Sequence, residues 1–339
     1  MGLPKQKGWQ DLLPFRQAGS SGAKGVPFNM FNEWKWFPAA WSPAPASPPT
    51  SMGVRMLCFS HTSFMDDRMR EPFRLSDDNC WIIGMIHVGA LPGTPHYGGD
   101  VERLLAQAEE EARIYRDEGV DALLVENMHD VPYLNRKVGP EITAAMTLLG
   151  HRVKAASGLD VGLQILAGAN REAMAAAHLA GLDFIRAEGF VFGHLADEGY
   201  MDACAGELLR YRHAIGADGI AVFTDIKKKH SSHALTQDVD IVATAKAAAF
   251  FEADGVIVTG TSTGAEADLE EVRSVGRAVD IAVLVGSGVT LENVDRYLPH
   301  AHGLIVGSHF KEAGRWQNPV DPLRVRAFMD KVQRLRKAR

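Results

Sequence analysis

The sequence predicts a single-domain α/β protein, a (β/α)8 TIM barrel, preceded by a disordered N-terminal extension. Two observations predict this organisation. From residue 79 onward, eight short apolar runs rich in β-branched residues alternate with longer amphipathic helical patterns. The composition changes near residue 75, so we place the extension at residues 1–75 and the barrel at residues 76–339. The second part is close to the ~250 residues that such barrels typically need.

The apolar runs predict strands of a parallel sheet, because strands that are covered on both faces are almost continuously hydrophobic. The predicted strands are residues 80–88, 122–127, 161–166, 184–189, 221–227, 255–260, 282–288 and 303–308. An amphipathic pattern follows each run, and the first pattern begins at Asp100, a good helix N-cap. A doubly wound open sheet is the alternative, but its glycine fingerprint would follow the first strand. Here the glycine-rich turns follow the last two runs.

The predicted extension has its own composition. Residues 1–75 hold 9 of the 16 prolines and nine basic against five acidic residues, whereas the rest of the chain is acidic. The run 39–50, AAWSPAPASPPT, does not suit helix or sheet, because proline lacks an N–H donor. We expect a disordered segment or an upstream start codon, and a cytoplasmic protein. The alternative is a mitochondrial presequence: residues 1–38 are acid-poor, although Arg16 is their single arginine.

Composition also excludes several classes of protein. A formal net charge of −6 with 23% charged residues argues against nucleic acid as a partner. No run approaches ~18 apolar residues, so no transmembrane helix is predicted. The cysteines Cys58, Cys80 and Cys204 are scattered and odd in number. They argue against a disulfide framework and against a cysteine zinc site.

Charged residues at the ends of the apolar runs are the catalytic candidates, because TIM barrels place their chemistry at the carboxyl ends of the strands. A buried charge is costly unless it is paired, so charges beside apolar strands indicate a use. These candidates are His87, Glu126, Arg186, Asp225 and Lys227.

Each candidate has an expected role. Glu126 or Asp225 would be the acid or base, and Arg186 with Lys227 would stabilise an oxyanion. Asp225 and Lys227 are two residues apart, so strand periodicity predicts that both point to one face and that Lys227 keeps Asp225 ionised. Lys227 could also be a Schiff-base amine. The neighbouring Lys228 and Lys229 fit a solvated basic loop.

Two glycine–serine turns predict a phosphate site. Glycine lets backbone N–H groups approach an anion closely, and a helix N-terminus after the turn adds positive potential. The predicted phosphate-binding residues are Gly286, Ser287, Gly288, Gly307 and Ser308, with Lys311 as a nearby cation. A small phosphorylated ligand is therefore the expected partner.

No cofactor is predicted. The set His87, Glu126, Asp225 and His230 could hold a divalent metal, but no His-x-x-x-His or similar spacing supports it. A metal is therefore kept as the lesser alternative. We also expect a homo-oligomer.

Several strings together resemble the BtpA/SgcQ family over residues 80–332. They are MIHVGALPGTPHYGG (85–99), GVDALLVENMHDVPY (119–133), GPEITAAM (139–146), VTGTSTG (258–264), VLVGSGVTLENV (283–294) and GLIVGSHFKEAGRWQNPVDPLRVRAFM (303–329). The resemblance implies a ribulose-phosphate-binding-type barrel. One branch is linked to photosystem I biogenesis at the thylakoid surface, which implies peripheral membrane association, and another lies in a sugar-utilisation gene cluster.

The chain departs from the pattern of that family at three strand ends. Residues 164–168 replace an Asn-x-Leu-Arg-Asn-like string, and Ala187 and Glu188 replace Val-Asn. Residues 225–231, DIKKKHS, stand where the family has an acidic-Val-Lys-His-Ser string. These positions lie at the predicted barrel mouth, so the resemblance does not transfer the substrate of either branch.

Two functions remain open. The first is an enzyme that acts on a small phosphorylated sugar or nucleoside by acid/base chemistry, as an isomerase, a lyase or an enzyme of glycosidic-bond chemistry. The second is a non-catalytic assembly or stability factor of the kind linked to photosystem I biogenesis. Buried mouth charges favour the enzyme, because a scaffold does not need them.

Overall fold

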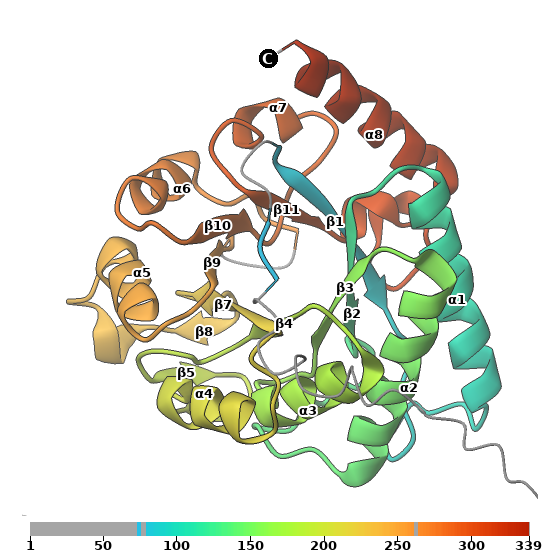
Figure 1. Ribbon diagram of the computed structural model, residues 1–339, viewed down its shortest axis with the longest axis horizontal. Coiled ribbons are helices and arrows are strands. Elements are labelled where there is room, and N and C mark those ends of the chain that lie inside the picture. The colour runs from blue at the N-terminus through green and yellow to red at the C-terminus, as the bar shows by residue number, and fades with distance from the viewer. Residues whose placement is uncertain (1–72, 76–78, 261–263, 339) are drawn as a thin grey trace, which may run out of the picture. The chain divides into compact units, whose positions relative to one another are not determined.

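The structure, a computed structural model, describes residues 73–75, 79–260 and 264–338, so the predicted extension lies mostly outside it. Parallel strands close into a barrel in the order β1-β11-β10-β9-β7-β4-β3-β2, with helices around it (Figure 1). The barrel strands are β1 (Trp81–His87), β2 (Ala122–Glu126), β3 (Asp160–Gln164), β4 (Phe184–Ala187), β7 (Ala221–Ile226), β9 (Gly255–Val258), β10 (Ala282–Val285) and β11 (Gly303–Val306). The predicted (β/α)8 barrel is confirmed.

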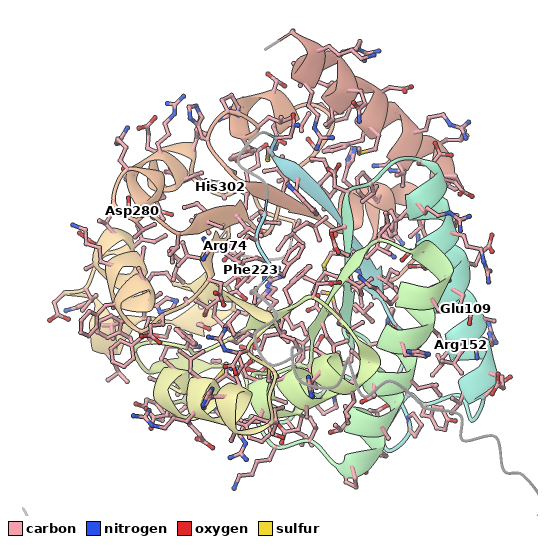
Figure 2. All side chains as sticks on the ribbon, viewed as in Figure 1. Arg74, Glu109, Arg152, Phe223, Asp280 and His302 are labelled. Atoms are coloured by element: carbon pink, nitrogen blue, oxygen red, sulfur yellow. The ribbon has the colours of Figure 1, made fainter. Side chains whose placement is uncertain are left out.

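Helices connect successive strands across the outside of the barrel. Within the described residues they are α1 (Val101–Asp117), α2 (Pro140–Ser157), α3 (Asn170–Ala180), α4 (Ala205–Ala214), α5 (Ile241–Phe250), α6 (Leu269–Gly276), α7 (Val294–Tyr297) and α8 (Pro322–Lys337). The side chain of Asp100 accepts a hydrogen bond from the Arg103 N–H, as its predicted N-cap role requires. Figure 2 shows Glu109 of α1 facing Arg152 of α2, where the two form an exposed ion pair.

The strands end one to three residues before the predicted ends, because the chain leaves the hydrogen-bonded ladder at the polar and glycine positions. At the end of β10, for example, Gly286 and Ser287 belong to the turn and not to the strand. The residues predicted as strand ends are therefore mostly the first residues of the mouth loops.

Two hydrophobic layers hold the barrel. The larger layer lies between the outer faces of the strands and the helices, and includes Tyr115 of α1 and Phe328 of α8. The smaller layer fills the interior and includes Ile83, Leu124, Phe184, Phe223, Ile257, Leu284 and Ile305. Phe223 lies at the centre of the barrel in Figure 2. The alternation along each strand therefore identifies the side chains that face the interior.

Residues 73–75 close the amino-terminal end of the barrel, although the sequence boundary assigned them to the extension. The Phe73 ring stacks on Phe184 with centroids 5.6 Å apart and meets Trp81 edge to face. Leu75 is buried in the same interior layer. These apolar side chains seal the end opposite the strand carboxyl ends, so the barrel begins no later than Phe73.

A small antiparallel sheet that the sequence did not predict stands at the mouth. It is formed by β5 (His194–Ala196), β6 (Gly199–Met201) and β8 (Ser231–Ser232), in the order β6-β5-β8. Single-turn 3-10 helices also lie after the barrel strands, η1 (Ala234–Thr236), η2 (Ser308–Phe310) and η3 (Glu312–Gly314). Pairing between β5 and β8 ties the loop after β4 to the loop after β7.

Candidate active site

One interior layer at the carboxyl ends of the strands differs from the layers beneath it. In each strand, the residue of this layer lies two positions after the interior residue of the layer beneath it, toward the carboxyl end. The layer consists of His87, Glu126, Gln164, Arg186, Asp225, Thr259, Gly286 and Gly307. Six of these positions carry polar side chains, and the last two, after β10 and β11, are glycine. Polar groups therefore crowd one side of the layer, while the glycines leave space on the other.

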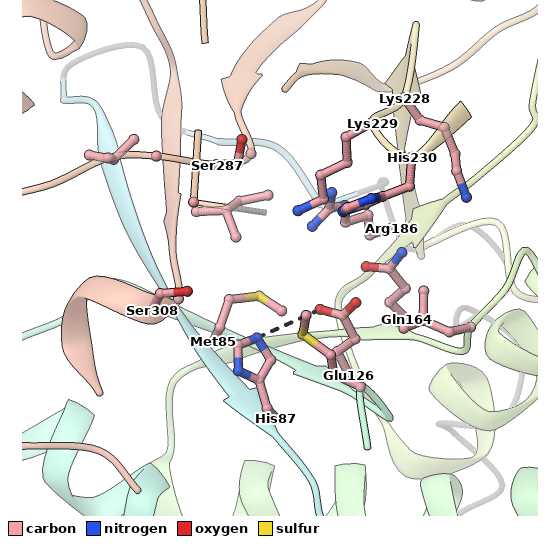
Figure 3. Close-up of a pocket in the computed structure, with 18 of the residues that line it drawn as sticks. Met85, His87, Glu126, Gln164, Arg186, Lys228, Lys229, His230, Ser287 and Ser308 are labelled. Atoms are coloured by element: carbon pink, nitrogen blue, oxygen red, sulfur yellow. Dashed lines mark ion pairs between the residues drawn. The ribbon is translucent and has the colours of Figure 1, made fainter. Parts of the chain in front are cut away.

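This layer forms the floor of a pocket of about 450 Å³, a size typical of small-molecule sites. Six of the eight layer residues line the pocket, all except Asp225 and Thr259. The walls come from the segments after the strands and include Glu188, Lys228, Lys229, His230, Ser287, Gly288 and Ser308, together with Arg324 of α8. Figure 3 shows Arg186, Lys229 and His230 on one side of the pocket and Ser308 on the other, with Glu126 between them.

Arg186 and Asp225 form a buried pair beneath the pocket. The guanidinium donates two hydrogen bonds to the carboxylate, of 3.0 and 2.9 Å. Burial disfavours the charge on Arg186, but Asp225 overcomes this and raises the pKa of Arg186 above its usual value. Asp225 is thus the counter-ion of Arg186, and its carboxylate does not line the pocket.

Lys227 does not occupy the position that strand periodicity predicts, and the expected Lys227–Asp225 pair is absent from the described structure. Strand β7 ends at Ile226, and Lys227 has a φ of +48°. This left-handed residue interrupts the period of two, so the Lys227 ammonium points away and donates to the Thr236 carbonyl and hydroxyl oxygens. Arg186 supplies the cation next to Asp225 instead.

The same turn sends Lys228 and Lys229 to the pocket, against the prediction that they belong to a solvated loop. Lys228 is buried and its ammonium lies 3.2 Å from Oε1 of Glu188. Lys229 lines the pocket near Arg186 and Glu126. Burial, followed by the neighbouring Arg186, lowers the pKa of Lys229, while Glu126 opposes this shift.

His87 and Glu126 lie close together on neighbouring strands, as predicted. Nε2 of His87 is 3.9 Å from Oε2 of Glu126, and Nδ1 of His87 lies 3.2 Å from the Trp316 carbonyl oxygen (Figure 3). Burial lowers the pKa of His87 well below its ordinary value, with a further contribution from Lys311. Burial raises the pKa of Glu126 against the opposing effect of Arg186. The neutral imidazole donates from Nδ1, so Nε2 can accept a proton from a ligand or from Glu126.

Two buried acceptor atoms at the pocket have no donor among the described residues. They are Oε1 of Gln164 and Oε2 of Glu188. A buried polar atom without a partner is costly, so each is suited to receive a hydrogen bond from a ligand. Both residues were outside the catalytic set predicted from the sequence.

The turn after β10 supplies donors at the opposite side of the pocket. No acceptor is found in the described part of the chain for the N–H groups of Ser287, Gly288 and Val289. The N–H of Gly286, by contrast, donates to the Val258 carbonyl and so is not available to an anion. A Cβ at Gly288, whose φ is +69°, would lie 2.3 Å from the Ala265 carbonyl oxygen, so this turn requires glycine.

Ser287 has a structural role through its hydroxyl. Its Oγ accepts from the Gly260 N–H at 2.9 Å and donates to the Ala265 carbonyl at 3.0 Å. The hydroxyl therefore joins the loop after β9 to the turn after β10. Only the backbone of Ser287 is left to bind a ligand.

The turn after β11 contributes Gly307 and Ser308 to the same side of the pocket, as predicted. Ser308 begins η2, so its N–H is a free helix-start donor. Arg324, in the first turn of α8, lines the pocket here and donates through Nε to the His309 carbonyl. Sequence reasoning did not single out Arg324, because nothing in a helix pattern shows that its first turn reaches the mouth.

Lys311 is not available to a ligand, contrary to expectation. Its side chain is 1% exposed and lies 2.7 Å from Glu111 of α1, which is also buried. The pair fixes the loop after β11 against the outer helix layer. The metal is the lesser alternative: in the described ranges, no group of three or more His, Cys, Asp or Glu side chains could hold a metal ion.

A model of the BtpA family matches residues 79–334, nearly the whole barrel. The chain belongs to the BtpA family. The resemblance of the sequence strings is confirmed.

Two relatives of this chain come from different organisms. The Caenorhabditis elegans protein F13E9.13, which is named as mitochondrial, is 49% identical over 76% of this chain and 94% of its own length. The photosystem I biogenesis protein BtpA of Synechocystis is 32% identical over 74% of this chain and 86% of its own length.

Solved structures with a similar fold include two Pyrococcus furiosus enzymes. Thiamine phosphate pyrophosphorylase has a TM-score of 0.49 at 12% identity, over 76% of this chain and 97% of that protein. N-(5'-phosphoribosyl)anthranilate isomerase has a TM-score of 0.47 at 16% identity, over 75% and 99%. Within the described ranges, no helix of this BtpA-family chain is long and apolar enough to span a membrane.

Proposed function

We propose that this BtpA-family protein is an enzyme that binds a small phosphorylated sugar or nucleoside at the barrel mouth and moves a proton with Glu126. The chemistry would be that of an isomerase, a lyase or an enzyme of glycosidic-bond cleavage. One observation carries the proposal: a single pocket joins backbone donors on one side to unpartnered acceptors and a carboxyl group of raised pKa on the other.

The donor side suits a phosphate group. The N–H groups of Gly288, Val289 and Ser308 have no acceptor among the described residues, and all three residues line the pocket beside Gly307. Arg324 adds a permanent positive charge beside them. Backbone N–H donors and an arginine are groups that bind phosphate dianions in proteins.

The acceptor side suits hydroxyl groups. Oε1 of Gln164 and Oε2 of Glu188 are buried and need donors. A sugar or ribosyl group presents several O–H donors at once, and would satisfy both atoms. The pocket is large enough for such a molecule and its phosphate.

Acid/base chemistry follows from the pair His87 and Glu126. Burial raises the pKa of Glu126, so a larger fraction of this carboxyl group is protonated at a given pH, which suits it to give up and regain a proton. His87 is neutral, and its Nε2 lies 3.9 Å from Oε2 of Glu126, so both groups can contact the same atom or neighbouring atoms of a ligand above them. Arg186, fixed by Asp225, provides a positive charge next to an oxyanion formed on the ligand.

A binding test uses two arginines of α8. Orthophosphate, sugar phosphates and nucleoside monophosphates should raise the melting temperature, since a ligand at 100 times its Kd stabilises by ~2.7 kcal/mol. Arg324→Met should weaken the binding of phosphate roughly 10- to 100-fold, the effect of losing one charged hydrogen bond. Arg326→Met is the matched control, because Arg326 is exposed and pairs with Glu118. A protein unaffected by any phosphorylated compound would refute the phosphate site.

A catalytic test needs no knowledge of the product. Incubation of candidate sugar phosphates in deuterated water should place deuterium on carbon, because a base that removes a C–H proton exchanges it with solvent. Glu126→Gln should retain binding and abolish this exchange. Binding of ligands without exchange or turnover in the wild-type protein would favour the alternative, a non-catalytic assembly or stability factor; the Synechocystis relative is named a photosystem I biogenesis protein.

Location, oligomeric state and membrane contact stay predictions. The name of the Caenorhabditis elegans relative supports the mitochondrial alternative over the cytoplasmic one. A fluorescent fusion to the complete chain would show which compartment holds the protein. Sedimentation of the purified protein would test for the homo-oligomer, and flotation with vesicles would test for peripheral membrane binding.

A further inference from the structure

Three consecutive lysines after β7 have three different surroundings. Lys227 is hydrogen-bonded to Thr236 outside the pocket. Lys228 is buried against Glu188. Lys229 lines the pocket, and its ammonium group has no hydrogen-bond or ion-pair partner among the described residues. Of the three, only Lys229 presents its amine to a ligand.

The backbone that presents Lys229 is strained. Lys227 and His230 have φ angles of +48° and +54°, in the left-handed region that residues other than glycine rarely adopt. The turn is held on one side by the bond from Lys227 to Thr236, and on the other by the pairing of β8 with β5. Strain that the surrounding structure maintains is concentrated at functional sites. Its result here is that Lys229 faces the interior.

We propose that Lys229 is the catalytic amine, which forms an imine with the carbonyl carbon of an open-chain phosphorylated aldose or ketose. The inference rests on the proposed function, because the turns after β10 and β11 bind the phosphate of this substrate. It narrows the substrate class from phosphorylated sugars or nucleosides to phosphorylated carbonyl compounds.

The neighbours of Lys229 act on the charge of its amine. Arg186 already places a fixed positive charge beside Lys229, and the two cations repel each other. Burial, with this repulsion, lowers the pKa of Lys229 and so increases its neutral fraction. The neutral amine has the lone pair that attack on a carbonyl requires.

The imine step balances with groups that are present. The amine lone pair of Lys229 forms a C–N bond, and the C=O π pair moves to oxygen, which takes up the proton released from nitrogen. The carboxyl group of Glu126 then gives a proton to this hydroxyl, the C–O bond breaks and water leaves. A cationic iminium remains beside the Glu126 carboxylate, and this carboxylate can next remove a proton from the adjacent carbon.

The test is chemical trapping on the full chain. The protein is incubated with dihydroxyacetone phosphate or pyridoxal 5'-phosphate and then reduced with borohydride, which converts an imine to a stable amine. Peptide mass mapping should locate one adduct, on Lys229. Lys229→Arg and Lys229→Met should lose it, whereas Lys246→Met should retain it, because Lys246 is exposed on α5 and does not line the pocket.

The pH dependence of trapping gives a second readout. Labelling of Lys229 should remain at pH values where exposed lysines no longer react, because its amine is more often neutral. The charged and titratable groups that face it are Arg186 and Glu188 of the β4 end, Glu126 of β2, Asp225 of β7 and His87 of β1. Labelling that follows the pH profile of exposed lysines would overturn the inference.

The outcomes separate this inference from the proposed function. If phosphate compounds raise the melting temperature but Lys229 stays unlabelled by both reagents, the imine inference fails and the phosphate site stands. If pyridoxal without phosphate labels Lys229 as well as pyridoxal 5'-phosphate does, and orthophosphate gives no protection, the amine stands and the phosphate site fails. An adduct spread over many lysines counts against Lys229.

Discussion

Arg186 of β4 and Asp225 of β7 are joined inside the barrel by two hydrogen bonds, of 3.0 and 2.9 Å. The two side chains are 6% and 1% exposed. Asp225 therefore neutralises and orients the arginine, while the arginine borders the pocket. Loss of either partner would leave the other as an unpaired charge in the barrel interior.

Asp225→Asn should lower the free energy of unfolding by about 3–5 kcal/mol, because it leaves the Arg186 charge buried without its counter-ion. Urea denaturation measures the change. Glu207→Gln is the control: it breaks the Arg171–Glu207 pair, which has a similar distance of 2.8 Å but is exposed to solvent. This control should cost no more than ~1 kcal/mol. Equal effects in the two variants would contradict the role given to Asp225.

The Lys311–Glu111 pair gives a second prediction. Lys311→Met alone should destabilise the protein by about 3–5 kcal/mol, because Glu111 stays buried without its cation. The double variant Lys311→Met/Glu111→Leu should recover most of this loss, since an apolar pair of similar volume needs no charge solvation. Urea denaturation of the two single variants and the double variant forms the cycle. A double variant that is no more stable than Lys311→Met would show that the pair matters for another reason.

His87 should make stability depend on pH. The pKa of His87 in the folded protein lies well below 6.5, the usual value in an unfolded chain. Between these two pKa values the unfolded chain binds more protons, so stability falls as the pH falls. Glu126 has the opposite effect, because its pKa in the folded protein is raised above 4.5. The stability that its protonated form contributes is lost as the pH rises through this folded pKa. His87→Asn retains a donor for the Trp316 carbonyl and removes the imidazole titration.

The measurement is urea unfolding of wild type and His87→Asn between about pH 7 and pH 5. The variant should lose less stability than the wild type as the pH is lowered. His178→Asn, on the exposed face of α3, should keep the wild-type slope. A wild-type slope in His87→Asn would show that other groups govern this window.

The amino-terminal end of the barrel can be tested by truncation and substitution. A chain that begins at Met65 should match the full chain in stability, because it retains Phe73 and Leu75. Leu75→Ala should cost about 2–5 kcal/mol, as expected for a buried leucine. Arg74→Ala is the control, since Arg74 is exposed between the two apolar residues. Aggregation of the chain starting at Met65 would show that the barrel needs residues before it.

Much of the site could be predicted because a parallel barrel brings all its strand carboxyl ends to one mouth. His87, Glu126, Arg186 and the two glycine turns needed only the recognition of eight apolar runs and the position at which each ends. The direction of each side chain followed from the period of two, as long as the residue remained in the strand. Lys227 is beyond the end of β7, and there the period no longer applied.

The sequence by itself determined the eightfold alternation, the family and the polar layer, because strand burial and side-chain alternation are local properties of the chain. Only the tertiary structure decided the partners. In the folded chain Asp225 pairs with Arg186, Lys311 is buried against Glu111, and Lys229 lines the pocket. Ion pairs join residues that are far apart in sequence, and a left-handed backbone angle at a lysine has no sequence signal. Both depend on how the closed barrel packs its loops, which no local pattern records.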